Sequence, residues 1–290
     1  MARLLILGAN GFIGKNLKEF FLKTTDYDVL APTRHELNLL DDAACTDYLG
    51  AHLPEFVIHC AVDITSVEKT LAMFFNIYNQ KASFGQLITL GSGAEYDKRC
   101  YTPNMTEERL GISVPIDTYG LAKYLIAREI ENGRNSNVLN LRVFGIFGPH
   151  EDINRRFISN NICRVLCGLP ISVNRDMLFN YIYVDDLAKA IALILPKLPL
   201  HSKSYNFCRS ASDSLLDIAE LIHRKLSVES EVIVRTPGRN PEYSGCPDKY
   251  FKEVGHVQFE PMDVSIDKLI KYYTQCMGSG ELKALREKWK

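Results

Sequence analysis

Short apolar runs alternate with amphipathic segments along the first part of the chain. Runs of consecutive apolar residues predict strands buried on both faces, as in a parallel sheet, and apolar residues at helical spacing predict helices. The expected strands lie at 4–7, 27–32, 56–61 and 86–90. The expected helices lie at 15–22, 43–53, 68–81 and 119–131. Strands that alternate with helices in this way predict an α/β fold built on a doubly wound parallel sheet.

The first strand runs directly into a glycine-rich turn. Gly8, Gly11 and Gly14 stand between this strand and the first predicted helix. Glycine lets the backbone approach a pyrophosphate, and a helix N-terminus presents unpaired N–H groups and a partial positive charge. A tight turn that merely happens to contain glycine is the alternative, but the strand-turn-helix context favours a dinucleotide site. The residues expected at this turn are Gly8, Asn10, Gly11, Phe12, Ile13 and Gly14.

The end of the second strand bears on the choice of dinucleotide. Chains that bind NAD carry an Asp or Glu there for the ribose 2′-hydroxyl, whereas this chain has Arg34. A guanidinium suits a 2′-phosphate, so we expect NADP(H), with NAD(H) and a merely solvated Arg34 as the alternatives. The other residues expected near the cofactor are Leu40, Asp41, Cys60 and Ala61.

A serine and a tyrosine–lysine pair are the candidate catalytic groups. Ser92 follows a predicted central strand, where a hydroxyl can reach a bound substrate. Tyr119 and Lys123 are four residues apart in a predicted helix and therefore share one face. An ammonium beside a phenol stabilises the phenolate, so we expect Lys123 to lower the pKa of Tyr119. The spacing alone is also found in ordinary helices; the glycine turn and Ser92 favour the catalytic interpretation.

Composition and charge exclude several classes of function. The 290 residues, 46% apolar and 24% charged, suit a soluble globular protein of one large or two unequal domains. The formal net charge of -1 gives no polyanion footprint, so we expect no nucleic-acid partner. Neither a secretory signal nor a membrane-spanning apolar run is recognisable, and we expect a cytoplasmic protein without a membrane partner.

The cysteines and one strand histidine are expected to be structural. Eight cysteines are scattered without a Cys-x-x-Cys pair, which indicates reduced, mostly buried thiols and no metal site. His59 lies inside a predicted strand and is interpreted as a core residue rather than a catalytic one.

Five motifs in sequence order resemble one enzyme family. They are Gly8–Gly14, Ser92 four residues before Tyr96, Tyr119–Lys123, Leu141–Pro149 and Tyr181–Leu187. Together they resemble the extended short-chain dehydrogenase/reductase family, in particular its nucleotide-sugar epimerases, dehydratases and reductases. The resemblance implies a Rossmann-type fold with a smaller C-terminal substrate-binding lobe, a nucleotide-diphosphate sugar as substrate and a homodimer. It also implies that Ser92, Tyr119 and Lys123 form the catalytic set.

The resemblance also divides the chain and suggests substrate-binding residues. We expect residues 1–168 and 182–227 to form the dinucleotide-binding domain, and residues 169–181 and 228–290 to form the substrate-binding lobe. The charged tail 281–290 is expected to be a short helix after a flexible joint. The candidate substrate-binding residues are Gly93, Ala94, Arg155, Arg156, Arg175 and Arg239, with Arg239 preferred for the diphosphate.

Within the family, the segment 34–41 and the Gly148-Pro149-His150 triplet resemble GDP-fucose synthase-like 4-keto-sugar reductases. That group epimerises its substrate with a Cys two residues after the catalytic Ser and a later His. Here the corresponding positions are Ala94 and the segment 154–158, which has no His. The resemblance therefore implies reduction of the C4 keto group of a nucleotide-linked 4-keto-6-deoxy sugar without C3/C5 epimerisation. An NAD-dependent nucleotide-sugar 4-epimerase and a non-catalytic dinucleotide sensor are the alternatives.

Overall fold

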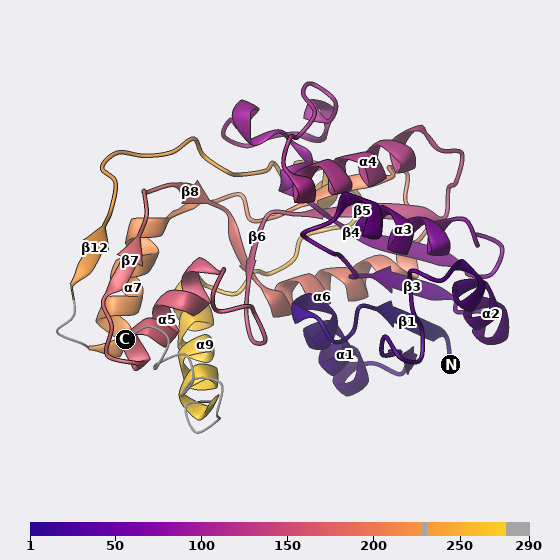
Figure 1. Cartoon of the computed structure of the whole chain (residues 1–290), viewed down its shortest axis with the longest axis horizontal. Coiled ribbons are helices and arrows are strands. Elements are labelled where there is room, and N and C mark those ends of the chain that lie inside the picture. Colours follow the sequence, from indigo (N-terminus) through magenta and orange to yellow (C-terminus); the bar gives the residue numbers. More distant parts are fainter. Residues whose placement is uncertain (228–230, 277–290) are drawn as a thin grey trace.

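Six parallel strands form the central sheet of the computed structural model, which describes residues 1–227 and 231–276 (Figure 1). Their spatial order is β2-β1-β3-β4-β5-β10. The order reverses at β1, which has β2 on one side and β3 on the other. Ligands of such sheets bind beyond the carboxyl ends of the strands at this switch point. The strands are β1 (Arg3–Leu7), β2 (Asp28–Leu30), β3 (Phe56–His59), β4 (Gln86–Ser92), β5 (Val138–Val143) and β10 (Ser204–Phe207).

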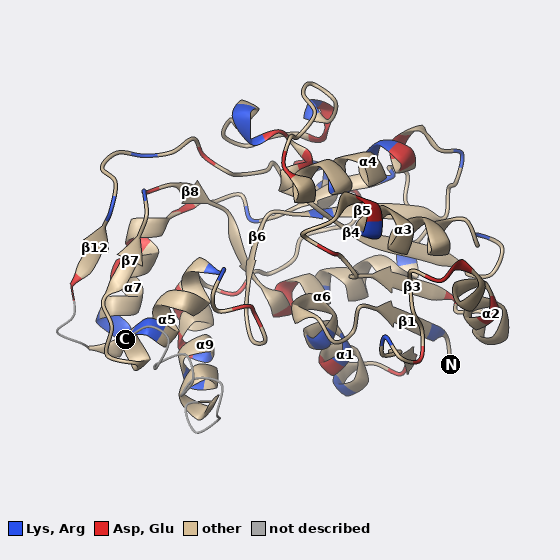
Figure 2. Ribbon diagram, viewed as in Figure 1, with Lys and Arg blue, Asp and Glu red and all other residues tan. Residues whose placement is uncertain are grey.

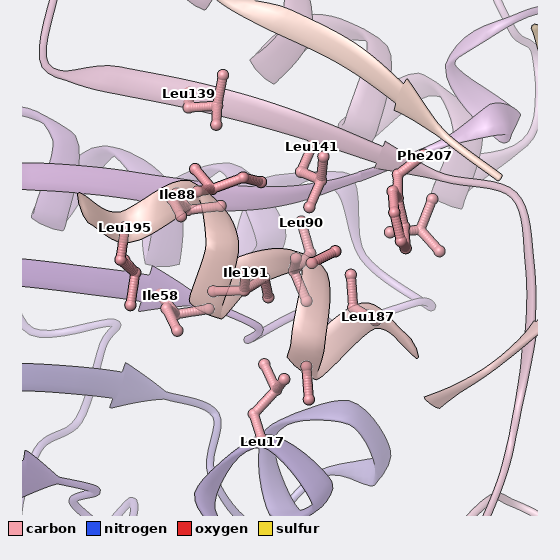
Figure 3. Close-up of a cluster of buried hydrophobic side chains, with 14 of the residues drawn as sticks. Leu17, Ile58, Ile88, Leu90, Leu139, Leu141, Leu187, Ile191, Leu195 and Phe207 are labelled. Carbon is pink, nitrogen blue, oxygen red and sulfur yellow. The ribbon is translucent and has the colours of Figure 1, made fainter. Parts of the chain in front are cut away.

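Helices cover both faces of this sheet, which confirms the predicted α/β, doubly wound architecture. On one face, α1 and α6 bury Leu17, Leu187 and Ile191 against strand residues such as Ile58 and Ile88 (Figure 3). On the other face, α2, α3 and α4 pack against the opposite side of the same strands. The bounds are α1 (Phe12–Thr24), α2 (Asp42–His52), α3 (Val67–Tyr78), α4 (Thr118–Asn132) and α6 (Val184–Ile194).

A second hydrophobic cluster forms the smaller lobe beside the sheet. It joins two short parallel strands to three helices, with Ile162, Ile222 and Leu269 completely buried. The elements are α5 (Phe157–Leu166), β7 (Ile171–Val173), α7 (Leu215–Leu226), β12 (Val232–Val234) and α9 (Met262–Cys276). The packing thus places α5 and α7 in the lobe. This differs from the expected division, in which 1–168 and 182–227 belonged to the dinucleotide-binding domain, because the apolar faces of these helices are buried against β7 and α9 rather than the sheet.

Short elements connect the two parts. The parallel pair of β6 and β9 lies between the sheet and the lobe in Figure 1, and β8 pairs with β11. Their bounds are β6 (Gly145–Phe147), β8 (Leu178–Phe179), β9 (Tyr181–Tyr183) and β11 (Asp213–Ser214). The remaining helices are η1 (Gly93–Glu95), η2 (Lys98–Cys100), η3 (Glu107–Arg109), η4 (Leu195–Lys197) and α8 (Asp248–Glu253).

Several details refine the expectations from the sequence. The strand expected at 27–32 is confined to Asp28–Leu30, and the expected tail helix lies outside the described residues. His59 is buried and its Nε2 is 3.1 Å from the Met73 carbonyl oxygen, which confirms a core histidine. Of the eight cysteines, four are buried and four are half-buried. No helix among the described residues is both long and apolar enough to cross a membrane.

Candidate active site

The turn between β1 and α1 forms a glycine cradle. Gly8 has a φ of +78°, and a β-carbon there would lie 2.7 Å from the Ala61 nitrogen. A β-carbon on Gly14 would lie 2.2 Å from the Gly8 carbonyl oxygen, so both positions require glycine. Gly11 caps α1 with extended backbone, no side chain caps the first N–H groups, and the first turn contains no acidic residue. This cradle therefore fits the pyrophosphate of a dinucleotide.

A cavity of about 390 Å³ opens at the switch point beside this cradle. Arg34 lies on its wall and is exposed, so the guanidinium is available to a bound anion. Asp41 does not line this cavity; its side chain accepts a hydrogen bond from Ala44 N at 3.1 Å and caps α2. The expected cofactor residues gathered here are Gly8, Asn10, Gly11, Arg34, Leu40 and Ala61.

A larger cavity of about 900 Å³ continues from the cradle toward the smaller lobe. It brings the glycine turn, Ser92 and Tyr119 to one space, although the turn and Ser92 are at least 78 residues apart in sequence. The expected residues that line it are Gly8, Gly11, Phe12, Ile13, Gly14, Cys60, Ala61, Ser92, Ala94, Tyr119, Arg155 and Arg156. Charges of both signs are interspersed over the two parts of the molecule in Figure 2, in keeping with the small net charge.

Ser92 lies where β4 ends and the short helix η1 begins. Its Oγ accepts a hydrogen bond from Ala94 N at 3.1 Å, and its own N–H donates to the Glu95 carboxylate at 2.9 Å. These two bonds form a capping box that fixes the backbone at the site.

Tyr119 and Lys123 lie in the first turns of α4, whose N-terminus is capped by the Asp117 side chain at 2.9 Å from Gly120 N. Burial raises the pKa of Tyr119, while hydrogen bonding with the Ser92 hydroxyl and the charge of Arg156 oppose that rise. The net rise differs from the expectation that Lys123 would lower this pKa. The Lys123 ammonium instead donates to the Leu90 carbonyl at 2.7 Å, and this lysine lines neither cavity.

A buried ionic network holds Glu95, the residue that accepts the Ser92 N–H. The Arg142 Nε lies 2.5 Å from a Glu95 carboxylate oxygen, and both side chains are essentially inaccessible, at 0% and 1% exposure. Burial alone would lower the pKa of Arg142, but the charge and hydrogen bond of Glu95, together with Tyr96 and Glu107, outweigh the burial, and the pKa is raised. Tyr96 and Asn206 accept further hydrogen bonds from Arg142 at 3.0 and 3.2 Å. This network was not predicted from the sequence.

Glu151 is a buried acidic group at the larger cavity that no sequence motif indicated. Burial raises its pKa to about 7, against the hydrogen bond from Ser159 and the charge of Arg156. The loop that carries it is held in place: Asn16 Nδ2 donates to the Pro149 carbonyl at 2.9 Å, and the Tyr272 hydroxyl lies 2.9 Å from His150 Nδ1. The Gly148-Pro149-His150 triplet marked this loop in the sequence, but only the fold shows that Glu151 is buried at the cavity.

Three expected substrate residues lie elsewhere. Arg239 forms an ion pair with Asp176 at 2.8 Å and lines neither cavity, and Arg175 is half-buried outside both. Gly93 is buried beneath the hydroxyl of Tyr243, which would lie 2.5 Å from a β-carbon at that position. The position of Arg239 therefore does not support the expectation that it binds the substrate diphosphate.

Known proteins share both the motifs and the fold. The sequence model of the NAD-dependent epimerase/dehydratase family matches residues 4–208. GDP-L-colitose synthase of Yersinia pseudotuberculosis is 23% identical over 219 residues, 65% of this chain and 70% of that protein. GDP-6-deoxy-D-talose 4-dehydrogenase of Aggregatibacter actinomycetemcomitans is 21% identical over 280 residues, 88% of this chain and 92% of that protein. The NADP-bound GDP-mannoheptose C4 reductase of Campylobacter jejuni superposes with a TM-score of 0.80 at 18% identity, covering 94% of this chain and 98% of that one.

Proposed function

The chain belongs to the NAD-dependent epimerase/dehydratase family, and we propose that it reduces the C4 keto group of a nucleotide-linked 4-keto-6-deoxy sugar with NADPH. The observation that carries this proposal is that the glycine cradle, Ser92 and Tyr119 line one cavity of about 900 Å³. The exposed guanidinium of Arg34 at the neighbouring cavity supports NADPH rather than NADH. The two relatives described above are named for GDP-linked sugars, which supports guanosine diphosphate as the nucleotide.

The site residues suit the reductive direction. Bound NADPH supplies a hydride to the C4 carbon. Because burial raises the pKa of Tyr119, its phenol stays protonated at neutral pH and gives its proton to the oxygen that becomes the C4 hydroxyl. The Ser92 hydroxyl donates a hydrogen bond to the same oxygen and stabilises the negative charge that develops there. The Lys123 ammonium donates to the Leu90 carbonyl near the end of β4, while burial lowers its pKa.

Two arginines at the cavity suit an anionic substrate. Arg155 and Arg156 line the side that faces the smaller lobe, and both are exposed. Arg155 lies 3.4 Å from the exposed carboxylate of Asp152, a contact that solvent weakens, and Arg156 lies 3.9 Å from Glu151. Planar guanidinium groups match phosphate oxygens, so we assign these two arginines to the substrate diphosphate.

The alternative functions predict different results in one assay. Purified protein is incubated with NADPH and a panel of GDP- and dTDP-linked 4-keto-6-deoxy sugars, and NADPH consumption is followed by its absorbance. Tyr119→Phe should retain NADPH binding and lose activity by about 10²–10⁴-fold, because only the proton donor is removed. Tyr250→Phe, which alters a buried tyrosine outside both cavities, is the matched control.

A 4-epimerase would instead convert a nucleotide hexose without net NADPH consumption. A dinucleotide sensor would bind NADPH and turn over none of the sugars, and Tyr119→Phe would leave its behaviour unchanged. Either outcome would contradict the assignment as a reductase.

A further inference from the structure

A second tyrosine reaches Ser92 from the C-terminal part of the chain. Tyr243 lines the larger cavity together with Ser92 and Tyr119. Its hydroxyl oxygen lies directly over the residue after Ser92, only 2.5 Å from where a β-carbon on Gly93 would be. The glycine at position 93 therefore makes room for the phenol. No sequence motif pointed to this tyrosine.

The ring of Tyr243 is fixed by aromatic neighbours. Its centroid lies 5.0 Å from that of Tyr101, 5.2 Å from Phe144 and 5.3 Å from Phe179. The residue is 9% exposed. Contacts at these distances restrict the ring to one orientation, with the hydroxyl directed at the site.

The backbone of the same segment is attached to both parts of the molecule. Tyr243 N donates to the Leu178 carbonyl at 2.9 Å, and Gly245 N donates to the buried Asn180 side chain at 3.0 Å. One residue away, the Ser244 carbonyl accepts from Met105 N at 2.9 Å. These hydrogen bonds hold the segment that carries the phenol to residues 178–180 and to Met105, so the fold fixes the position of the phenol near Ser92.

The hydrogen bonds at Ser92 bear on which of the hydroxyls donates and which accepts. Ser92 Oγ already accepts from Ala94 N and has one proton to donate. Both Tyr119 and Tyr243 form a hydrogen bond with this hydroxyl, and burial raises the pKa of each phenol, so each phenol keeps a proton at neutral pH. A serine hydroxyl can accept two hydrogen bonds and donate one. Beside the bond from Ala94 N, Ser92 Oγ can therefore accept a hydrogen bond from one phenol and donate its own proton to another oxygen.

We propose that Tyr243 is a positioning residue for the reduction: its phenol donates to Ser92 Oγ and directs the single Ser92 proton toward Tyr119 in the free enzyme and toward the substrate oxygen when substrate is bound. Tyr243 acts through Ser92 and makes no assigned contact with the sugar. A hydroxyl that accepts a hydrogen bond becomes a better donor, so the chain of three hydroxyls strengthens the bond to the oxygen on which charge develops. This inference rests on the proposed reductase function for its kinetic consequences only.

The kinetic test compares Tyr243→Phe with wild type. Phe keeps the ring among its aromatic neighbours and removes only the hydroxyl. We expect kcat to fall about 3–10-fold, the effect of one lost neutral hydrogen bond, with KM within about twofold. In a Ser92→Ala background the same substitution should cause no further loss, because its effect passes through Ser92. Tyr250→Phe, another buried tyrosine of the C-terminal segment but one outside both cavities, should leave kcat unchanged.

A second test needs no turnover. The full-length protein is labelled with tyrosine carrying ¹³C at the ring carbon that bears the hydroxyl, and the Tyr119 resonance is assigned by its loss in Tyr119→Phe. Tyr243→Phe should shift the Tyr119 resonance in the wild-type background and leave it unmoved in Ser92→Ala. Tyr250→Phe should leave it unmoved in both.

An unchanged kcat, an equal loss with and without Ser92, or an unmoved Tyr119 resonance would overturn the role of Tyr243. If the wild-type protein reduces none of the sugars, the reductase assignment falls, while the resonance experiment still decides whether Tyr243 is linked to Tyr119 through Ser92.

Discussion

The buried pair of Glu95 and Arg142 predicts that a second substitution rescues the first. Glu95→Leu leaves the Arg142 guanidinium buried without its counter-charge, which costs about 3–5 kcal/mol. It also removes the acceptor of the Ser92 N–H, which adds about 1–3 kcal/mol. Replacing Arg142 by Met in the same chain eliminates the first cost and leaves the second. The double variant should therefore be more stable than Glu95→Leu alone by about 3–5 kcal/mol.

Thermal unfolding measures this difference directly. A change of 1 kcal/mol shifts the midpoint of a large domain by about 2 °C, so the double variant should unfold about 6–10 °C above Glu95→Leu. The exposed pair of Arg3 and Asp28, at 41% and 49% exposure, is the matched control, and Asp28→Ala should cost less than about 1 kcal/mol. A double variant with a lower unfolding midpoint than Glu95→Leu would show that the Glu95 and Arg142 side chains are not coupled.

Two further predictions concern the cofactor and pH. Arg34→Ala should weaken NADPH binding by about 1–3 kcal/mol and leave NADH binding unchanged in a titration, whereas the exposed Arg134→Ala should alter neither; equal losses for both cofactors would remove Arg34 from this role. Burial raises the pKa of Glu151 in the folded protein to about 7, above the ordinary value of 4.5, so its contribution to stability falls as pH rises from about 4.5 to about 7. Glu151→Gln should therefore be more stable than wild type by up to about 3 kcal/mol at pH 8, with little difference at pH 5, and a pH-independent difference would contradict the burial of a titrating carboxyl.

Local patterns were sufficient where function depends on local geometry. The glycine turn, the Ser92 strand end and the Tyr119–Lys123 spacing each lie within a few residues, and the structure brings Gly11, Ser92 and Tyr119 to one cavity. The strand and helix alternation likewise predicted the parallel sheet, because buried parallel strands are continuous apolar runs.

Residues that meet only through tertiary packing could not be predicted. Arg142 pairs with Glu95 across 47 positions, and neither charge is recognisable as buried from its neighbours in sequence. Tyr243 reaches Ser92 from a turn-rich segment without periodicity. The lobe boundary was misplaced for a related reason: the apolar face of α5 indicates that it is buried, but not whether the sheet or the lobe covers it. Arg239 was preferred for its charge, and the fold neutralises that charge with Asp176.

Transfer of deuterium from the cofactor to the sugar is the sharpest test of the C4 reductase assignment. The protein is incubated in heavy water with a 4-keto-6-deoxy sugar nucleotide and NADPH, and in ordinary water with NADPH deuterated at the hydride position, and the products are examined by NMR. Because the proposed reductase uses Tyr119 at the C4 oxygen and Ala94 offers no acid or base, we expect deuterium at C4 from the labelled NADPH, one per NADPH consumed. No solvent deuterium should appear at C3 or C5. Absence of cofactor deuterium at C4, or solvent deuterium at C3 or C5 above a control without enzyme, would contradict a simple C4 reductase.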